Sequence, residues 1–559
     1  MISPLRLLLR LPLHMWFALR ISCLLVLFSF ISCQNKEKVD LLIYNAKIYS
    51  CDSLFSVHEA MAIREGLIID IGKTADIRAK YQSTEEKDAL GQVIIPGLID
   101  AHSHFLGYGK SLFEVNLTGT RSFEEVLERL EAFAQAHPDG WITGRGWDQN
   151  DWPGKMYPSR FALDSLFPDR PVLIKRVDGH AALANTKALE MASIKEAGRI
   201  TGGEILASGK DKTPSGILID NAVELVDRLV PAPDMQQFMS YIKLAQKNCI
   251  DKGLTAVCDA GLDVRSIKAL RKAEEDKILQ IGVYAMHEAK ASNIDSILSA
   301  GIFNSQNLNI RSLKVYADGA LGSRGACMKK EYSDQKGHSG FLLKSPDSLA
   351  WFAEKIAGSA FQMNTHCIGD SANKYILALA EKFLKSKTDH RWRIEHAQVV
   401  DVKDIPLFAA TGVIPSVQPV HATSDMYWAK NRIGEARLKG AYAYGDLLRS
   451  FGWIPAGSDF PVESINPMHG IYAAISRRDT LGRPPERFMA EQALSRKDAL
   501  LAYTIWAAKA CFWEKERGSL EKGKRADFLF IDRDIMSCPE INIFKTQVLE
   551  TWIRGEKKH

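Results

Sequence analysis

The stretch "IIPGLIDAHSHFLGYG", residues 94–109, contains an apolar run followed by two histidines, His102 and His104, one residue apart. If the run is a β-strand, residues two apart point to the same face, so both imidazoles reach a single ion. Imidazole is a common ligand of transition metals. Two solvated or hydrogen-bonded histidines fit the pair equally well, because His-x-His occurs often by chance. A metal site therefore needs further ligands elsewhere in the chain.

Three more apolar runs end in residues of the same chemistry. "NTHCIGD" contains His366, "RIEHAQ" contains His396, and "AGSDFP" contains Asp459. One such histidine alone is more often a satisfied core residue, but the placement repeats at the carboxyl ends of four candidate strands. Because the carboxyl ends of parallel strands meet at one face of a barrel, this repetition favours one shared metal site.

Eight candidate strands separated by helical stretches carry these residues. Parallel strands with crossover helices predict an α/β chain, and eight strands close a (β/α)8 TIM barrel. We expect the barrel over 96–514, with a large insertion after strand 1, at about 105–250, overhanging the mouth formed by the strands' carboxyl ends. The candidate strands cover residues 97–104, 253–261, 280–288, 311–319, 361–369, 391–398, 412–419 and 452–459.

The two ends of the chain have a different sequence pattern. Residues 39–95 and 515–559 are rich in short strand and turn patterns, which predict one small β-sandwich built from both ends. The composition, 46% hydrophobic and 25% charged with a formal net charge of +5, is that of a globular protein. No run of Lys or Arg indicates a nucleic-acid partner. The scattered cysteines, an odd number outside the leader, argue against a disulfide framework.

Residues 1–32 are predicted to be a lipoprotein signal peptide. Arginines precede an apolar run at 21–31 that is too short to span a membrane comfortably. The Ser32-Cys33 boundary resembles the lipobox of bacterial lipoproteins, which implies lipidation of Cys33, and residues 33–38 then form a polar tether. We therefore expect a lipid-anchored protein of the bacterial cell envelope. The alternatives are a plain secretory signal with an incidental Cys33 and a shorter signal that starts at Met15.

The motifs together resemble the amidohydrolase superfamily, in particular the subgroup of N-substituted formamide deformylases (amidohydrolase family 3). The resemblance covers nearly the whole mature chain. It implies a metal-dependent hydrolase that cleaves a C–N (amide-type) bond of a small molecule with a metal-activated hydroxide. It rests on "PGLIDAHSH", "VYADGALGSRGA", "HCIGDSANK", "IEHAQ", "GSDFPV" and "GKRADFLFID".

The resemblance also implies a ligand set with two divalent metals. His102, His104 and Asp459 would hold one ion and His366 with His396 the other. A carboxylated Lys314, in "RSLKVYADG", would bridge two Zn²⁺, although Mn²⁺, Fe²⁺ or Co²⁺ also suit these donors. Asp459 would act as general base and then general acid.

Lys314 has an alternative role. Strand alternation points its side chain into the barrel, where an unpaired ammonium is rarely buried. Lys314 could instead form an ion pair with Asp318 or a neighbouring carboxylate, in which case the site would hold a single metal.

Candidate substrate-binding residues lie on the insertion and near the ends of later strands. On the insertion, His180 could instead cap a helix, and Trp147 could be a core residue. Arg324, in the glycine-rich "DGALGSRG", could meet an anionic substrate group. The full set is His180, Trp147, Asp318, Arg324 and His421.

Three other functions compete with amide hydrolysis. One is a lipid-anchored, non-catalytic binding protein on a degenerate barrel, which the intact set of ligand types disfavours. Another is hydrolysis of an ester or other acyl bond on the same site. The third is a glycosidase, which needs two facing carboxyl groups, and no acid pair at strand ends competes with the histidines.

The leader generates a first prediction. The mature chain should begin at Cys33 and carry acyl groups, which mass spectrometry of the protein purified from membranes would detect. A mature chain that begins at another residue, without acyl groups, would contradict the lipoprotein interpretation.

Overall fold

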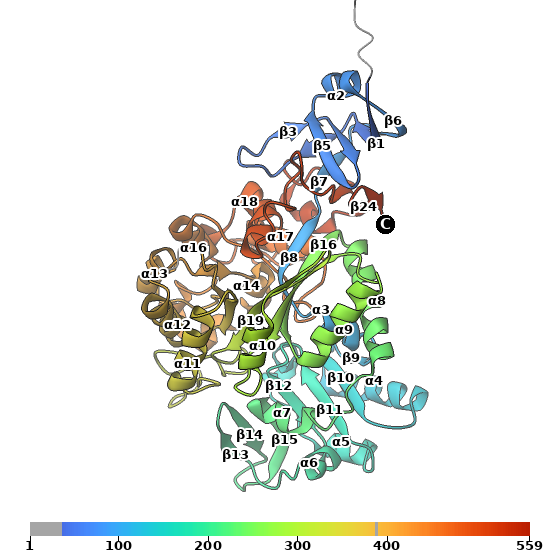
Figure 1. The fold of residues 1–559 in the computed structure, drawn as a ribbon. Helices are drawn as coiled ribbons and strands as arrows, with labels where there is room; N and C mark the ends of the chain where they lie inside the picture. Colours follow the sequence, from blue (N-terminus) through green and yellow to red (C-terminus); the bar gives the residue numbers. More distant parts are fainter. Residues whose placement is uncertain (1–35, 386–388) are drawn as a thin grey trace, which may run out of the picture.

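The structure is a computed structural model that describes residues 36–385 and 389–559. Figure 1 shows three parts: a β-sandwich at one end, a barrel in the middle, and the inserted sheet at the opposite end. The α/β barrel is the fold that the strand pattern predicted. The expected signal peptide, Cys33 and the start of the tether lie outside the described residues. In the part of the chain that the structure describes, no helix is long and apolar enough to cross a membrane.

The barrel sheet is parallel, and its strands are neighbours in chain order. Its order runs from the seventh strand back to the first, β22-β21-β20-β19-β17-β16-β8, among the described residues. The strands are β8 (Leu98–Ser103), β16 (Leu254–Leu262), β17 (Gly282–Glu288), β19 (Leu308–Tyr316), β20 (Gln362–Cys367), β21 (Arg393–His396) and β22 (Ile414–Ser416).

The eighth barrel segment closes the ring without forming a regular strand. Ala456 bridges Val417 beside β22, and its carbonyl oxygen accepts a hydrogen bond of 3.1 Å from the Ala101 backbone N–H on β8. The sequence pattern predicted a full strand over 452–459. Pro455 lacks a backbone N–H, so an uninterrupted ladder is not available to this segment.

The crossover helices cover the outside of the barrel. Helix α8 (Met235–Asp251) begins with a capping box between Asp234 and Gln237. Its buried face, which includes Phe238 and Ile242, packs in the main hydrophobic core next to the second strand. Strand residues that face these helices are apolar, whereas those that face inward include the polar ligands of the site.

The insertion contains its own mixed sheet, ordered β13-β14-β15-β12-β11-β10-β9. Helix α3 (Phe105–Ser111) leaves the barrel and packs on α8, so closely that a Cβ at Gly109 would lie 2.5 Å from the Tyr241 carbonyl oxygen. The sheet runs from Val115 to Asp220, inside the predicted insertion at about 105–250. Its strands are β9 (Val115–Asn116), β10 (Ile142–Trp147), β11 (Val172–Arg176), β12 (Ala181–Ala184), β13 (Gly198–Ile200), β14 (Gly203–Ala207) and β15 (Pro214–Asp220).

The sandwich has two sheets, and one of them joins both ends of the chain. In the order β25-β24-β23-β7-β2-β3, β23 (Phe528–Ile531) pairs antiparallel with β7 (Val93–Pro96). The other sheet is β5-β4-β1-β6. Its strand β1 (Glu37–Tyr44) already contains Glu37 and Lys38, so the tether expected over 33–38 ends earlier than predicted. The remaining strands are β2 (Lys47–Tyr49), β3 (Val57–His58), β4 (Ala60–Arg64), β5 (Leu67–Gly72), β6 (Tyr81–Asp88), β24 (Val548–Ile553) and β25 (Glu556–Lys557).

The sandwich is joined directly to the first barrel strand. β7 passes into β8 through Gly97, where a Cβ would lie 2.3 Å from the Thr255 hydroxyl oxygen. Only glycine fits this contact without moving β16. The junction therefore holds the strand that carries His102 in a defined position.

Candidate metal centre

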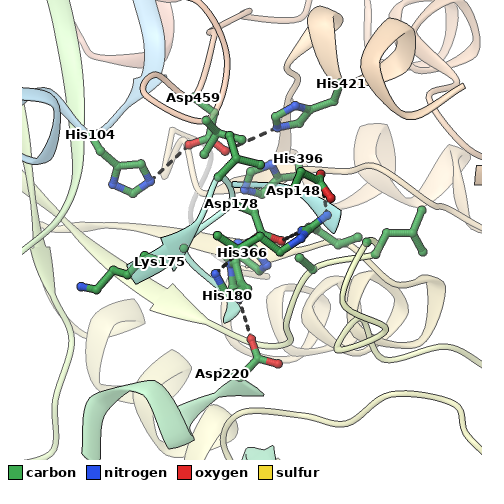
Figure 2. A pocket seen from close by; sticks show the side chains of 18 of the residues that line it. His104, Asp148, Lys175, Asp178, His180, Asp220, His366, His396, His421 and Asp459 are labelled. Carbon is green, nitrogen blue, oxygen red and sulfur yellow. Dashed lines mark hydrogen bonds and ion pairs between the residues drawn. The ribbon is translucent and has the colours of Figure 1, made fainter. Parts of the chain in front are cut away.

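The predicted metal ligands from different barrel strands lie together at the mouth (Figure 2). The His102 and His396 ring centroids are 5.0 Å apart, and those of His366 and His396 are 4.6 Å apart. His104, Lys314, His366, His396 and Asp459 line one cavity of about 630 Å³. His102 is fully buried beside it, with its Nε2 3.2 Å from the Lys314 Nζ. The structure thus brings all six predicted ligands to one place.

The two histidines of the first strand are held in defined tautomers. His102 Nδ1 lies 2.5 Å from Glu395 Oε2, and His104 Nδ1 lies 3.1 Å from the Ala260 carbonyl oxygen. Since both acceptors require a proton on Nδ1, each Nε2 keeps its lone pair. These Nε2 atoms lie 3.6 Å and 3.2 Å from Asp459 Oδ1. Both imidazoles therefore direct Nε2 toward the Asp459 carboxylate.

Asp459 is shared by two groups of potential ligands. Its carboxylate forms one group with His102 and His104 and a second with His396 and His421, each with donor atoms within 4.8 Å of one another. The prediction paired His396 with His366 instead. His366 lies beside His396 but outside both groups of the described part of the chain.

His421, expected to be a substrate residue, lies next to the metal centre. It belongs to helix α14 (Pro419–Asp425), which follows β22 directly. Its Nε2 is 3.4 Å from Asp459 Oδ2 and its Nδ1 is 3.1 Å from Glu463 Oε1. Burial alone would lower the pKa of His421, but hydrogen bonds to Asp459 and Glu463 raise it to about 10. Without an ion, His421 is therefore best described as a cation between two carboxylates.

The unpaired state of the inner side chains fits a metal. His366 and His396 are only 3% and 5% exposed, and neither ring makes a hydrogen bond to any described residue. Buried polar groups normally have partners, so such groups mark a missing ligand. Imidazoles with a shared carboxylate are a donor set that binds Zn²⁺ and similar ions.

Lys314 is buried without a carboxylate partner. It is 1% exposed, and within residues 36–385 and 389–559 its Nζ forms no ion pair. The alternative pair with Asp318 is absent, because the Asp318 carboxylate accepts backbone N–H groups of Cys327, Ile368 and Gly369. Burial lowers the pKa of Lys314 to about 8. A neutral amine, the form that reacts with carbon dioxide, is therefore accessible near neutral pH.

Two predicted substrate residues lie away from the cavity. The three backbone contacts of Asp318 hold the loop after β19 and the start of the segment after β20, so its role is structural. Arg324 pairs with Asp334 through Nε and Nη2 at 3.1 Å and 2.9 Å. Both side chains are thus held by contacts within the chain, neither lines the cavity, and Asp318 Oδ1 lies 3.9 Å from His366 Nε2, so a substrate contact stays a prediction for each.

Trp147 is also a structural residue. Its side chain is fully buried in the insertion core, and its indole N–H donates to the Ile174 carbonyl oxygen at 3.0 Å. A bulge at Gly146, with φ of +119°, shifts the pairing register between Arg145 and Trp147. The shift turns Trp147 into the core and leaves Arg145 and Asp148 on the cavity side.

His180 lines the cavity and is held by Asp220. Its Nδ1 is 2.6 Å from Asp220 Oδ1, and its ring centroid lies 5.0 Å from that of His366. Burial lowers the pKa of His180, but the hydrogen bond to Asp220 outweighs it and the net pKa is raised. His180 does not cap a helix, because β12 follows it and Asn185 caps the next helix.

The glycine-rich loop after β19 packs against this histidine and aspartate. A Cβ at Gly319 or Gly325 would lie about 2.5 Å or 2.4 Å from Asp220 Oδ2. The glycines of "DGALGSRG" therefore make room for a buried carboxylate.

Sequence reasoning missed several residues of the site. Glu395 left a usable signal, because an acidic residue inside an apolar strand is rarely buried without a partner. Asp178, which pairs with Arg176, lies in the turn after β11 and left none. Glu463, the partner of His421, lies in irregular chain after the eighth segment and could not be placed.

Comparison with known proteins identifies the family. Residues 85–557 match the family described as "Amidohydrolase family". The chain belongs to this family. Protein LONG AFTER FAR-RED 3 of Arabidopsis thaliana is 30% identical over 538 residues, which cover 93% of this chain and 91% of that protein. N-substituted formamide deformylase of Arthrobacter pascens is 25% identical over 92% of this chain and 97% of its own.

A solved structure shares the fold of this amidohydrolase. It is described as an uncharacterised metal-dependent hydrolase from Pyrococcus horikoshii OT3 and is 28% identical, with a TM-score of 0.73. The match covers 89% of this chain and 99% of that one. This amidohydrolase is therefore a metal-dependent hydrolase by family, fold and available ligands.

The contact between His102 and Glu395 generates a prediction about metal affinity. Glu395→Gln keeps an oxygen that can accept from His102 Nδ1 but removes its negative charge, so His102 becomes a weaker and less firmly oriented ligand and metal should bind about ten- to a hundred-fold more weakly. Competition with a chromogenic chelator measures the metal affinity of the folded fraction. Thermal unfolding is followed separately, because Arg393 loses its ionic partner in this variant. Glu275→Gln, on an exposed helix position, is the matched control. Unchanged metal affinity in Glu395→Gln would show that Glu395 does not orient the ligand.

Proposed function

We propose that this amidohydrolase hydrolyses a C–N (amide-type) bond in a small molecule. The observation that carries the proposal is the pair of ligand groups sharing Asp459 at the wall of a cavity of about 630 Å³. That volume suits a small-molecule substrate. The relative from Arthrobacter pascens, named as an N-substituted formamide deformylase, supports this class of reaction. N-formyl and N-acyl amines are therefore the first substrates to test.

We propose two divalent ions, Zn²⁺ in the first instance, with a carboxylated Lys314 between them. The support is the buried Lys314 Nζ, which forms no ion pair with a carboxylate of the described residues and lies 3.2 Å from His102 Nε2. An unmodified ammonium offers no lone pair to a cation, whereas a carbamate offers two oxygens. Such ions lower the pKa of water and polarise a carbonyl group when they are bound.

The chain's own residues then orient the substrate and move protons. The Asp459 carboxylate lies between His104 Nε2 and His421 Nε2, so its oxygens are held at the reacting centre. We assign to it the acceptance of a proton from water and its transfer to the departing amine. His180 uses Nδ1–H for Asp220, which leaves Nε2 as the ring nitrogen for a substrate contact. The envelope location implied by the leader is part of the same proposal.

Asp459→Asn tests the proton transfer. The amide retains an oxygen for the site but cannot carry the proton, so hydrolysis should fall by about 10²- to 10⁴-fold. Amine release from a panel of N-formyl and N-acyl amines, measured on metal-loaded protein, gives the rate. Asp76→Asn, at an exposed position of the sandwich, should keep the wild-type rate. If metal-loaded wild type hydrolyses no member of the panel, the proposed reaction class is wrong.

Lys314→Ala tests the bridging role. Metal content and activity should be lost together, and acetate or formate should restore part of both by placing two oxygens in the vacated space. Metal per chain is measured with and without added carboxylate or bicarbonate, with Lys73→Ala, an exposed lysine, as the control. Metal content equal to that of the wild type would contradict the bridging ligand.

A further inference from the structure

The cavity wall that the insertion contributes carries an arginine without an ionic partner. Arg145 lines the cavity, and no carboxylate among residues 36–385 and 389–559 forms an ion pair with it. Its Nε and Nη2 both donate to the Val177 carbonyl oxygen, at 3.2 Å and 3.0 Å. Nη1 donates to no described residue. The guanidinium is thus fixed at one edge and has free donors at the other.

The fold gives this guanidinium its place. Gly146 bulges out of the β10–β11 ladder, and a Cβ there would lie 2.4 Å from the Thr118 hydroxyl oxygen. A Cβ at Gly179 would lie 3.3 Å from Arg145 Nη2. Gly146 therefore allows the bulge to pack against Thr118, and Gly179 leaves space beside the Arg145 guanidinium, which lines the cavity.

Most other charges of this wall already have partners. Arg176 is paired with Asp148 at 2.6 Å and also with Asp178. Lys175 is 2.8 Å from Asp227. Arg176, which lies between two carboxylates, and Lys175, which is paired with one, therefore offer no uncompensated positive charge to a substrate.

Lys344 is a second cavity cation without an ion pair, but its surroundings differ. Burial lowers the pKa of Lys344, and Glu288 and Glu224, which line the same cavity wall, offset part of this shift. Burial also lowers the pKa of Arg145, and Asp459 is the carboxylate that offsets this shift most. Arg145 also lines the same cavity as Asp459, the carboxylate shared by both groups of potential metal ligands. A partly buried guanidinium without an anion is costly, and a bound anion would relieve that cost.

We propose that Arg145 binds a carboxylate of the substrate, so that the natural substrates are amides that carry a carboxylate near the scissile bond. The planar fork of a guanidinium matches a carboxylate. A single charge suits the site better than a phosphate dianion, because Asp178 and Asp148 lie on the same wall. This inference rests on the proposed amide hydrolysis and narrows its substrate class.

Matched ligands test the inference. N-benzoylglycine and the neutral N-benzoylglycinamide differ only in the anionic group, and calorimetric titration of metal-loaded, full-length protein measures the affinity for each. Wild type should bind the anion more tightly. Arg145→Met should weaken binding of the anion by about ten- to a hundred-fold, the loss expected for a charge-assisted hydrogen bond, and leave the neutral ligand unchanged. Arg145→Lys should retain part of the preference.

A control variant checks that any loss of affinity is specific to Arg145. Arg121→Met removes an exposed guanidinium from the same insertion and should bind both ligands as the wild type does. Equal affinity of the wild type for both ligands would overturn the inference even if Arg145→Met does not fold. Equal weakening of both ligands in Arg145→Met, or tighter binding of inorganic phosphate than of the carboxylate, would also overturn it.

The same titrations separate this inference from the proposed reaction. If an Arg145-dependent preference for the anion is found but neither ligand nor any amide of the panel is hydrolysed, the carboxylate site stands and the reaction class fails. If neutral amides are hydrolysed as fast as their anionic counterparts and Arg145→Met changes neither rate, the reaction class stands and the carboxylate site fails.

Discussion

The buried contact between Glu395 and His102 is the interaction on which the metal centre depends. Glu395 is fully buried and forms an ion pair of 2.7 Å with Arg393, which also donates to Ser416 Oγ on the next strand at 3.1 Å. Burial alone would raise the pKa of Glu395, but Arg393 and His102 hold it well below its ordinary value. A charged carboxylate is thereby maintained inside the barrel. It orients His102, and His102 in turn lies against Lys314 and Asp459.

The barrel and the insertion contribute different kinds of polar group to the cavity. The strands supply neutral imidazoles and the buried Lys314, which have few partners of their own and fit an ion. The insertion supplies charged side chains that already form ion pairs, together with His180, which is held by Asp220. Among the described cations that the insertion contributes to the cavity, Arg145 has no ion pair, whereas Lys175 and Arg176 do. Chemistry common to a family can therefore be kept in the strands, while the insertion determines which molecule is accepted.

Sequence reasoning was sufficient to place side chains where the alternation of a strand alone decides which way each of them points. The ligands at strand ends and the inward Lys314 follow from alternation and from the rule that carboxyl ends of parallel strands share a face. It was insufficient where alternation breaks, as at the Gly146 bulge, which exchanges Trp147 for Arg145 at the cavity. It also failed for His421, because a helix starting directly after β22 turns that residue back toward Asp459. The roles of Asp318 and Arg324 depend on backbone amides and on Asp334, which no local pattern reveals.

The pairing of β7 with β23 has a consequence for biogenesis. Val93 lies opposite Ile531, so the sheet that joins the sandwich to the first barrel strand combines segments from almost opposite ends of the polypeptide. During synthesis, β7 emerges early, and the edge that pairs with β23 stays unpaired until nearly the whole chain has been made. Such distant pairings slow folding, and an unpaired edge is a site of aggregation. A nascent or C-terminally shortened chain therefore lacks the β23 partner of β7, the strand that leads through Gly97 into the strand bearing His102.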